Sequence, residues 1–393
     1  MRKKRIFLVT LLIFALLLTG CKPSKTGIVD RKEWESTYPR QVAMFESNSD
    51  MSSTKFGGSE PYSYLEKYPY LKTLYDGYGF AKQYDRARGH VYAVEDVLST
   101  ARPKKGASCL ACKTSEFTDA LLKDKGVSAT NFEEFAKDHV KVGFTCYDCH
   151  GETPGKLDVK RVHINEAMQI KGMDSKIKDK ELACAQCHTE YYMTKDENEV
   201  KLPWTKGLGC KEAYEYYEES DFFDWEHPGT GAKLLKAQHP EVETFSGSKH
   251  ENMGLTCLDC HMQKVEVDGK KVTNHHWTSP LKTDMTNSCL KCHHNETKEQ
   301  LVKGVESVQA SVTKRTEEVG EKLNDYVVKL TAAKESGSID ADKLGKMQNV
   351  HREAQFYWDY VFVENGEGFH NTEKQLQYLN HADELVSKAL EEL

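Results

Sequence analysis

Apolar residues recur at helical spacing through residues 296–393. They fall three or four positions apart, which places them on one face of an α-helix. The run Ser336-Gly337-Ser338 interrupts this pattern, and Asn365-Gly366-Glu367-Gly368 interrupts it again. We therefore expect one long helix, a second helix over about Asp340–Val363, and a third helix capped by Asn371 or Thr372. The apolar faces of the first and third helices comprise Leu301, Val305, Val308, Val312, Val319, Leu323 and Leu330, and Leu376, Leu379, Leu385, Val386 and Leu390.

Period-two alternation, the pattern typical of half-buried strands, is scarce in the rest of the chain. The predicted fold class is therefore mainly α. Residues 56–295 carry the cysteine motifs described below, and we expect this body and the tail, residues 296–393, to form one globular unit. Residues 21–55 are polar and rich in Ser, Thr and Lys, which predicts an irregular tether and N-terminal arm. The stripe on the tail fits either an internal core or a dimer interface.

The first twenty residues have the composition of an export signal. Four cations, Arg2 to Arg5, precede an apolar run over Ile6–Leu18 that is too short for a confident membrane span. The following Leu18-Thr19-Gly20-Cys21 resembles the bacterial lipoprotein cleavage box. This predicts that residues 1–20 are removed and that a lipid on Cys21 anchors the protein to the outer face of the cytoplasmic membrane. An ordinary signal peptide beside a chance cysteine is the alternative.

The charge balance excludes some partners. The formal net charge is −7, and loss of residues 1–20 removes four cations and no acid, so the mature chain carries −11. An acidic chain of this kind is a poor partner for nucleic acid. An anionic substrate would need a pocket that is locally positive.

Ten of the twelve cysteines lie in five Cys-x-x-Cys pairs. Four pairs are followed by histidine, which is the attachment site of a c-type haem: the thiols bond the vinyl groups and the imidazole ligates the iron. Disulfide pairing does not explain the histidines, and zinc ribbons use such pairs two at a time, whereas five is odd. The motifs are Cys109-x-x-Cys112-Lys113, Cys146-x-x-Cys149-His150, Cys184-x-x-Cys187-His188, Cys257-x-x-Cys260-His261 and Cys289-x-x-Cys292-His293.

The first motif ends in Lys113 instead of histidine. Lysine ligates a metal only as a neutral amine, so this site must be partly desolvated. An iron with lysine on one face and no protein ligand on the other can bind substrate, whereas irons with two histidine ligands only pass electrons. The alternative is a degenerate motif with Lys113 in solvent. The third and fourth motifs start 73 residues apart, about twice the neighbouring intervals, which indicates a second function for that segment.

Five motifs of which the first ends in lysine, an export signal and a helical tail resemble the pentahaem cytochrome c nitrite reductases, which form ammonia. The resemblance extends from about Tyr62 to the end of the chain. It implies a multihaem cytochrome c fold with a haem-packed core, long C-terminal helices and five covalently bound haem c groups. It also implies that Arg102, Tyr191 and His239 line the open face of the Lys113 haem. The segment between Arg102 and Lys113 is shorter than the family pattern.

The resemblance further implies the remaining ligands. His275 would be the distal ligand of the second haem, with His276 as the alternative, and His90, His370 and His250 would serve the third, fourth and fifth. One calcium ion would bind the carboxylate of Glu190, the amide oxygen of Gln238 and the backbone carbonyls of Tyr191 and Lys236, an all-oxygen shell that suits a hard cation. The alternative for Glu190 and Gln238 is ordinary polar residues on loops.

The implied reaction is the six-electron reduction of nitrite to ammonium. Arg102 and His239 would hydrogen-bond the nitrite oxygens, and Tyr191 would donate a further hydrogen bond. An electron-transfer cytochrome without its own substrate is one alternative, and a hydroxylamine or sulfite reductase is another. The resemblance also implies a membrane quinol dehydrogenase cytochrome as electron donor and a homodimer formed through the tail. For Cys210 we expect a buried free thiol.

Overall fold

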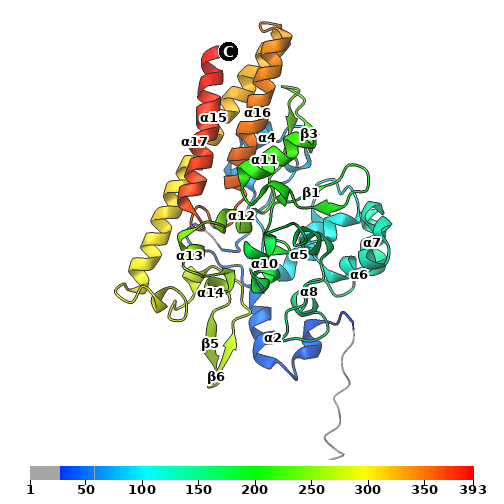
Figure 1. Ribbon diagram of the computed structural model, residues 1–393, viewed down its shortest axis with the longest axis vertical. Helices are drawn as coiled ribbons and strands as arrows, with labels where there is room; N and C mark the ends of the chain where they lie inside the picture. The colour runs from blue at the N-terminus through cyan, green and yellow to red at the C-terminus, as the bar shows by residue number, and fades with distance from the viewer. Residues whose placement is uncertain (1–26, 57) are drawn as a thin grey trace, which may run out of the picture.

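Three long C-terminal helices form one side of the molecule. The computed structural model describes residues 27–56 and 58–393, and in it α15 (Lys298–Ser336), α16 (Ala341–Phe362) and α17 (Thr372–Glu392) pack side by side (Figure 1). Thr297 and Gln300 form a capping box at the start of α15, and Gly337, with φ of 66°, ends it. Asn371 caps α17 by accepting a hydrogen bond from Lys374 N. The predicted helices of the tail, their breaks and the cap are confirmed.

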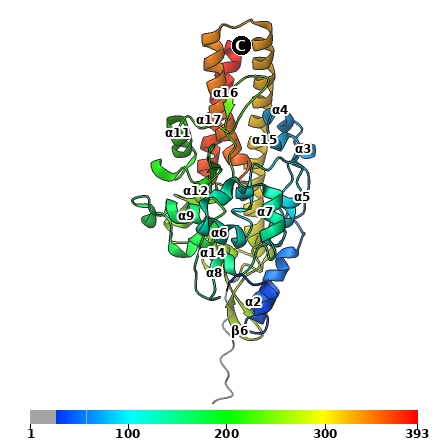
Figure 2. The ribbon, with the colours of Figure 1, turned by 90° about the vertical axis from the view of Figure 1, so that its right-hand side faces the viewer.

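The motif-bearing body consists of short helices joined by long loops, and it lies below and beside the C-terminal helices (Figures 1 and 2). Most of these helices span only one or two turns. Their bounds are α2 Pro39–Glu46, α3 Tyr64–Lys67, α4 Leu71–Leu74, α5 Ala93–Ser99, α6 Ser115–Lys123, α7 Phe132–His139, α8 Tyr147–His150, α9 Val162–Ala167, α10 Leu182–Ala185, α11 Cys210–Glu219, α12 Glu241–Phe245, α13 Lys249–Asn252 and α14 Cys257–His261.

Strands are few and short among the described residues. Each of the three sheets is a two-stranded antiparallel ribbon, with the orders β1-β2, β3-β4 and β5-β6. The strands are β1 Tyr192–Met193, β2 Val200–Lys201, β3 Trp225–Glu226, β4 Lys233–Leu234, β5 Lys264–Val267 and β6 Lys270–Thr273. The mainly helical fold class that the sequence predicts is therefore confirmed.

The largest hydrophobic core joins the body to the tail. It extends from Leu65 and Leu71 in the body to Leu379 and Val386 on α17. On α15 the apolar face is buried from Val312 onward, whereas its first turns, including Leu301, are only half-buried. Residues of the body and of the tail therefore share one core.

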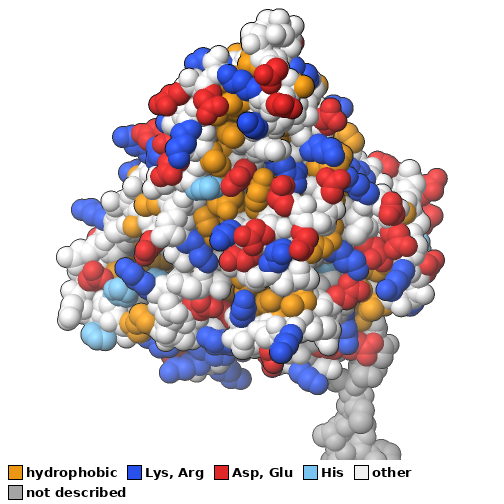
Figure 3. Space-filling view, turned by 45° about the horizontal axis from the view of Figure 1, so that its top comes forward, with side chains coloured by type: hydrophobic (Ala, Val, Ile, Leu, Met, Phe, Trp, Pro, Cys, Tyr) orange, Lys and Arg blue, Asp and Glu red, His pale blue; other side chains and the backbone are white. Residues whose placement is uncertain are grey.

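Acidic and basic side chains are interspersed over the face shown in Figure 3. Among residues 27–56 and 58–393, no helix is both long and apolar enough to cross a bilayer. The predicted export signal and the lipidation site at Cys21 lie outside the described residues.

The N-terminal arm is more ordered than its polar composition led us to expect. Helix α2 buries Val42 and Phe45, and the Phe45 ring lies 5.1 Å from that of Trp277 and 6.0 Å from that of Phe144. Asn48, 3% exposed, donates to the carbonyl of His275 and accepts from Trp277 N, both at 2.8 Å. A few buried side chains therefore hold the arm on the body, and composition averaged over the segment did not reveal them.

A buried ion pair attaches the body loop after β4 to helix α16. The Asp359 carboxylate accepts from Lys236 Nζ at 3.0 Å, from Ala237 N at 3.0 Å and from the Tyr75 hydroxyl. Both charged side chains are at most 1% exposed. Because a buried charge without its partner is strongly unfavourable, this pair makes the position of residues 236–239 depend on α16.

Replacing Asp359 with alanine should therefore destabilise the protein. We expect the free energy of unfolding to fall by about 3–5 kcal/mol, because the Lys236 ammonium would stay buried without a counterion. Chemical denaturation followed by the haem and helix signals measures this change. The control is Asp325→Ala, which removes a partner of Lys329 in an ion pair that is more than half exposed; its effect should stay below about 1 kcal/mol. Equal effects of the two substitutions would contradict the role of the buried pair.

Candidate active site

One cavity of about 1510 Å³ collects the motifs from the whole body. Nine of the ten motif cysteines line it, as do Lys113, His150, His188 and His261. Cys292 is exposed, and neither it nor His293 is part of this lining. All four predicted distal histidines also line the cavity: His90, His250, His275 and His370. Thiols and imidazoles from segments far apart in sequence thus face one interior space large enough for bulky planar groups.

The third motif lies at the junction of the others. Cys187 Sγ is 3.7 Å from the carbonyl of Cys112, and Gln186 Nε2 is 3.6 Å from Cys149 Sγ. The Cys184 thiol contacts that of Cys257, and Cys260 interacts electrostatically with Cys289. The third motif therefore touches the first, the second and the fourth, and the fourth leads to the fifth. Groups attached at these cysteines would form one continuous branched series.

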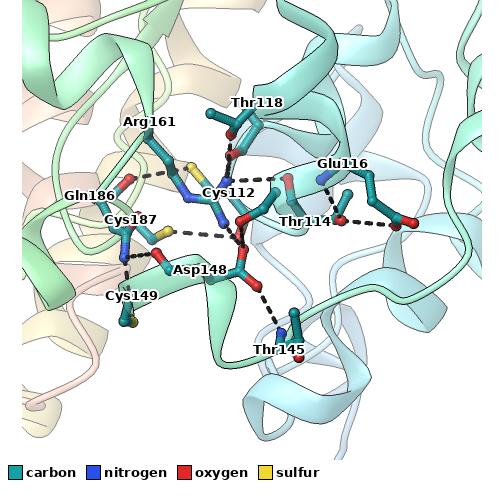
Figure 4. A network of polar contacts seen from close by, with 12 residues as sticks. Cys112, Thr114, Glu116, Thr118, Thr145, Asp148, Cys149, Arg161, Gln186 and Cys187 are labelled. Atoms are coloured by element: carbon teal, nitrogen blue, oxygen red, sulfur yellow. Dashed lines mark hydrogen bonds and ion pairs between the residues drawn. The ribbon is translucent and has the colours of Figure 1, made fainter. Parts of the chain in front are cut away.

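A buried polar network joins the first three motifs (Figure 4). Arg161, 1% exposed, donates to the carbonyls of Ala111 at 2.6 Å and Thr114 at 3.2 Å, which flank Cys112-Lys113. It also pairs with Asp148 at 2.6 Å, a residue inside the second motif. Gln186, inside the third motif, donates to the Asp148 carbonyl at 3.0 Å. One arginine thus links the backbone of the first motif to the second and, through Gln186, to the third.

Three of the predicted histidine pairs have the spacing that a shared iron requires. The ring centroids are 6.3 Å apart for His150 and His275, 5.9 Å for His90 and His188, and 6.3 Å for His261 and His370. Two metal–nitrogen bonds of about 2 Å, with about 1.1 Å from each nitrogen to its ring centre, require about 6.2 Å. His188 is also 6.3 Å from His239, with the rings at 66°, so spacing alone does not choose its partner.

Less direct observations bear on the fourth predicted pair, His250 with His293, and on the choice between His275 and His276. His250 lies close enough to His293 for the two imidazoles to interact electrostatically. His275 faces His150 and lines the cavity, whereas the adjacent His276 does not line it. The geometry therefore favours His275 over His276 as the second distal ligand.

The outer nitrogens of these histidines are held by protein oxygens. His150, His261 and His275 place Nδ1 within 2.9, 3.1 and 2.9 Å of the carbonyls of Lys156, Thr278 and Thr273. At three other histidines a carboxylate oxygen lies beside Nδ1 instead. These pairs are His188 with Glu241, His293 with Glu296, and His370 with Glu364. Histidines that bind metals are commonly held in this way, with the other ring nitrogen directed to the metal. The side chains present thus fit covalently attached haem.

The four predicted catalytic residues line the same cavity. The Arg102 guanidinium lies 4.3 Å from the centre of the Phe80 ring, and its Nε is 3.3 Å from Thr100 Oγ1. Among the described residues, buried His239 Nδ1 finds no hydrogen-bond partner. The pKa of His239 falls to about 4, chiefly because burial disfavours the imidazolium, although Glu241 opposes the shift. Burial likewise raises the pKa of the Tyr191 hydroxyl, so this group stays a hydrogen-bond donor.

The predicted calcium ligands also come together. Glu190, fully buried, accepts from Gln238 N at 2.7 Å and from the Tyr217 hydroxyl at 2.9 Å. Gln238 Nε2 donates to the carbonyl of Lys236 at 3.0 Å. Burial, together with the nearby carboxylates of Glu243 and Asp224, raises the pKa of Glu190 well above its usual value. The one ammonium nearby, Lys236 Nζ, is turned toward Asp359. A cation beside Glu190 would relieve this cost. Among the described residues, no cluster of three or more His, Cys, Asp and Glu side chains suited to a metal is found.

Several residues of the site were not predicted. Glu241 holds His188 and directly follows His239-Pro240, while Phe80 and Tyr78 lie beside Arg102. Glu241 could have been suspected from its place after the candidate histidine. Arg161 and Phe80 are brought to the site by the fold and carry no local motif. Cys210 is buried with a free thiol, as expected.

Comparison with known proteins agrees with this arrangement. The chain matches the family model Cytochrome c552 over residues 30–393. It is 32% identical to cytochrome c nitrite reductase subunit NrfA of Nitratidesulfovibrio vulgaris Hildenborough, over 90% of this chain and 76% of that one. It is also 32% identical to cytochrome c-552 of Bacteroides fragilis, over 93% and 76% of the two chains.

A solved structure shares the fold. The catalytic subunit of cytochrome c nitrite reductase from Desulfovibrio desulfuricans superposes with a TM-score of 0.86 at 29% identity, over 93% of this chain and 87% of that one. The multihaem fold with long C-terminal helices inferred from the motifs is thereby confirmed. This chain belongs to the cytochrome c552 family, the family that includes the cytochrome c nitrite reductases.

Proposed function

We propose that this protein is the catalytic subunit of an ammonia-forming cytochrome c nitrite reductase. The reaction combines nitrite with six electrons and eight protons and yields ammonium and two waters. The similarity to nitrite reductases over most of the chain supports nitrite as the substrate. The single observation that carries the proposal is that Arg102, Tyr191 and His239 share one cavity with Lys113 of the first motif.

The proposed cofactors are five haem c groups, one at each motif. Cys109, Cys112 and Lys113 would hold the first haem, which would supply electrons and an iron to which the substrate binds. The other four would each take a histidine pair: His150 with His275, His188 with His90, His261 with His370 and His293 with His250. The contacts between motifs support a continuous electron path that ends at the first motif.

The three polar side chains differ in what they can do for an anion. Phe80 and Thr100 orient the Arg102 guanidinium, whose planar array of donors can bind the oxygens of nitrite. His239 is neutral and buried, so it can donate a hydrogen bond or pass on a proton without holding a charge. Tyr191 remains protonated and donates a hydrogen bond. Together they neutralise the substrate and supply protons as its N–O bonds break.

One calcium ion is proposed beside this site. The Desulfovibrio desulfuricans enzyme has been described with two calcium sites in its catalytic subunit. In this chain Glu190 would bind by its carboxylate, Gln238 by its amide oxygen, and Tyr191 and Lys236 by their carbonyls. Such an ion would add a fixed positive charge and hold the loop that carries His239.

The setting of the enzyme completes the proposal. We place it on the outer face of the cytoplasmic membrane, anchored through Cys21, with a membrane quinol dehydrogenase cytochrome as its donor. Helices α15, α16 and α17 would provide the homodimer interface. A pure electron-transfer cytochrome and a hydroxylamine or sulfite reductase are less well supported, because two of the similar proteins named above are cytochrome c nitrite reductases.

The stoichiometry of the reaction tests the proposed function. Fully haem-loaded protein given nitrite and a reduced viologen dye should consume six electrons per nitrite and release one ammonium. Dye oxidation and ammonium are measured on the same sample. No consumption, together with a spectrum in which every haem is low-spin, would mean that the chain only carries electrons.

Replacing His239 with alanine should lower nitrite turnover by about 100-fold or more, because a positioned proton donor contributes about 10²–10⁴-fold. Haem content, measured as the pyridine haemochrome, should not change. The matched control is His381→Ala, which removes a partly exposed histidine paired with Glu353 on the far helices and should leave turnover intact. Undiminished turnover in a fully loaded His239 variant would exclude the assigned role.

Replacing Glu190 with glutamine should weaken calcium binding by about 10–100-fold, because the site loses its only carboxylate ligand. Bound calcium is measured by elemental analysis after equilibrium dialysis against calcium buffers. Glu166→Gln provides the control, since Glu166 pairs with Lys201 at the surface. Calcium occupancy that is the same in both variants, or absent from the wild type, would argue against the proposed site.

A further inference from the structure

The buried pair of Arg161 and Asp148 is the one full ion pair found at the junction of the first three motifs in the described part of the chain. Its atoms are 2.6 Å apart, and the two side chains are 2% and 0% exposed. Arg161 immediately precedes α9, and Asp148 lies in α8 between Cys146 and Cys149 (Figure 4). A charged pair removed from water gains little net stability over a nonpolar pair, so its presence among the motifs calls for a function.

The positive end of the pair lies against the first motif. Arg161 Nη1 donates to Ala111 O, Thr114 O and Thr118 Oγ1 at 2.6, 3.2 and 3.0 Å. Ala111 and Thr114 immediately flank Cys112-Lys113, so the guanidinium holds the backbone on both sides of the expected lysine ligand.

The negative end of the pair lies inside the second motif. The Asp148 carboxylate accepts from Thr145 N and Ser115 Oγ, each at 2.7 Å. These bonds hold it between Cys146 and Cys149. The ion pair is thus a dipole with a defined direction, positive at the first motif and negative at the second.

We propose that the Arg161–Asp148 pair sets the relative potentials of the haems at this junction, in addition to positioning Lys113. The inference rests on the proposed function, because it presumes haem at these motifs. A nearby positive charge stabilises the reduced form of a haem, and a negative charge stabilises the oxidised form. The pair therefore raises the midpoint potential at the first motif and lowers the one at the second.

The direction of the dipole favours the net transfer of an electron from the second motif to the first, where the proposed substrate site lies. Such a transfer, which can pass through the third motif, oxidises the haem of the second motif and reduces that of the first. With Asp148 inside the second motif and Arg161 against the first, the net transfer is favoured and its return is disfavoured. Arg161 and Asp148 are positioning residues, because neither touches the substrate site.

Charge and geometry can be separated by substitution. The double variant Arg161→Gln/Asp148→Asn removes both charges and keeps side chains that can hydrogen-bond. Arg161→Lys keeps the charge but loses the planar fork that reaches Ala111, Thr114 and Asp148 together. Glu166→Gln/Lys201→Gln is the matched control. It neutralises an ion pair of similar length, 2.7 Å, that is partly exposed to solvent.

Redox titration followed by electron paramagnetic resonance tests the proposal in the holoprotein without nitrite. In the double variant, the midpoint potential of the high-spin haem should shift to a more negative value, and that of one low-spin haem should shift to a more positive value. In Arg161→Lys the high-spin potential should stay near that of the wild type, while the line shape of its signal changes because Lys113 is held differently. The control variant should show no shift.

Haem content decides how these results are interpreted. Unchanged potentials in a double variant with full haem content would overturn the proposal and leave the pair a purely structural role. If the double variant does not fold with full haem, Asp148→Asn alone, which keeps size and most hydrogen bonds, provides a second test. It should still raise the midpoint potential of one low-spin haem. No shift in that potential would also overturn the proposal. Failure of the proposed function would show separately, as absence of ammonium formation by the wild type.

Discussion

The structure depends on one constraint: histidines from distant segments must be brought to one site, and six of them are held at one ring nitrogen by protein oxygens. The Nδ1 atoms of His150, His261 and His275 meet backbone carbonyls, and those of three further histidines meet carboxylates. This arrangement fixes the orientation of each ring before a metal is considered. The short helices and long loops of the body follow from it, because they have to bring many separate segments to one space.

The C-terminal helices hold loops of the body in position. Asp359 on α16 holds Lys236 and Ala237, which precede Gln238 and His239. Asn48 of the N-terminal arm holds the His275 loop from the opposite part of the chain. The reactive side of the cavity is therefore positioned by elements that carry no cysteine motif, and Arg161 plays the same part within the body.

The sequence predicted most of the site because the relevant signals are local. Each Cys-x-x-Cys-His motif specifies its own chemistry within five residues, and the apolar periodicity of the tail specifies its helices. The Glu190-Tyr191 and Gln238-His239 segments were found through the resemblance, and the structure brings them together. The order of the arm was missed, because Phe45 and Asn48 gain their significance only from contacts with Trp277 and His275, more than two hundred residues away.

The sequence by itself determined the kind of cofactor, the exceptional status of Lys113, the helical class and the family. Tertiary structure alone decided which motifs are neighbours, which histidines face each other and where buried charges lie. The physical reason is that covalent attachment and helix formation depend on residues close in the chain. Ring pairing and ion pairing depend on distances between segments, which only the folded chain sets. Arg161 shows the difference: in sequence it is an ordinary cation, and in the fold it is the charge at the centre of three motifs.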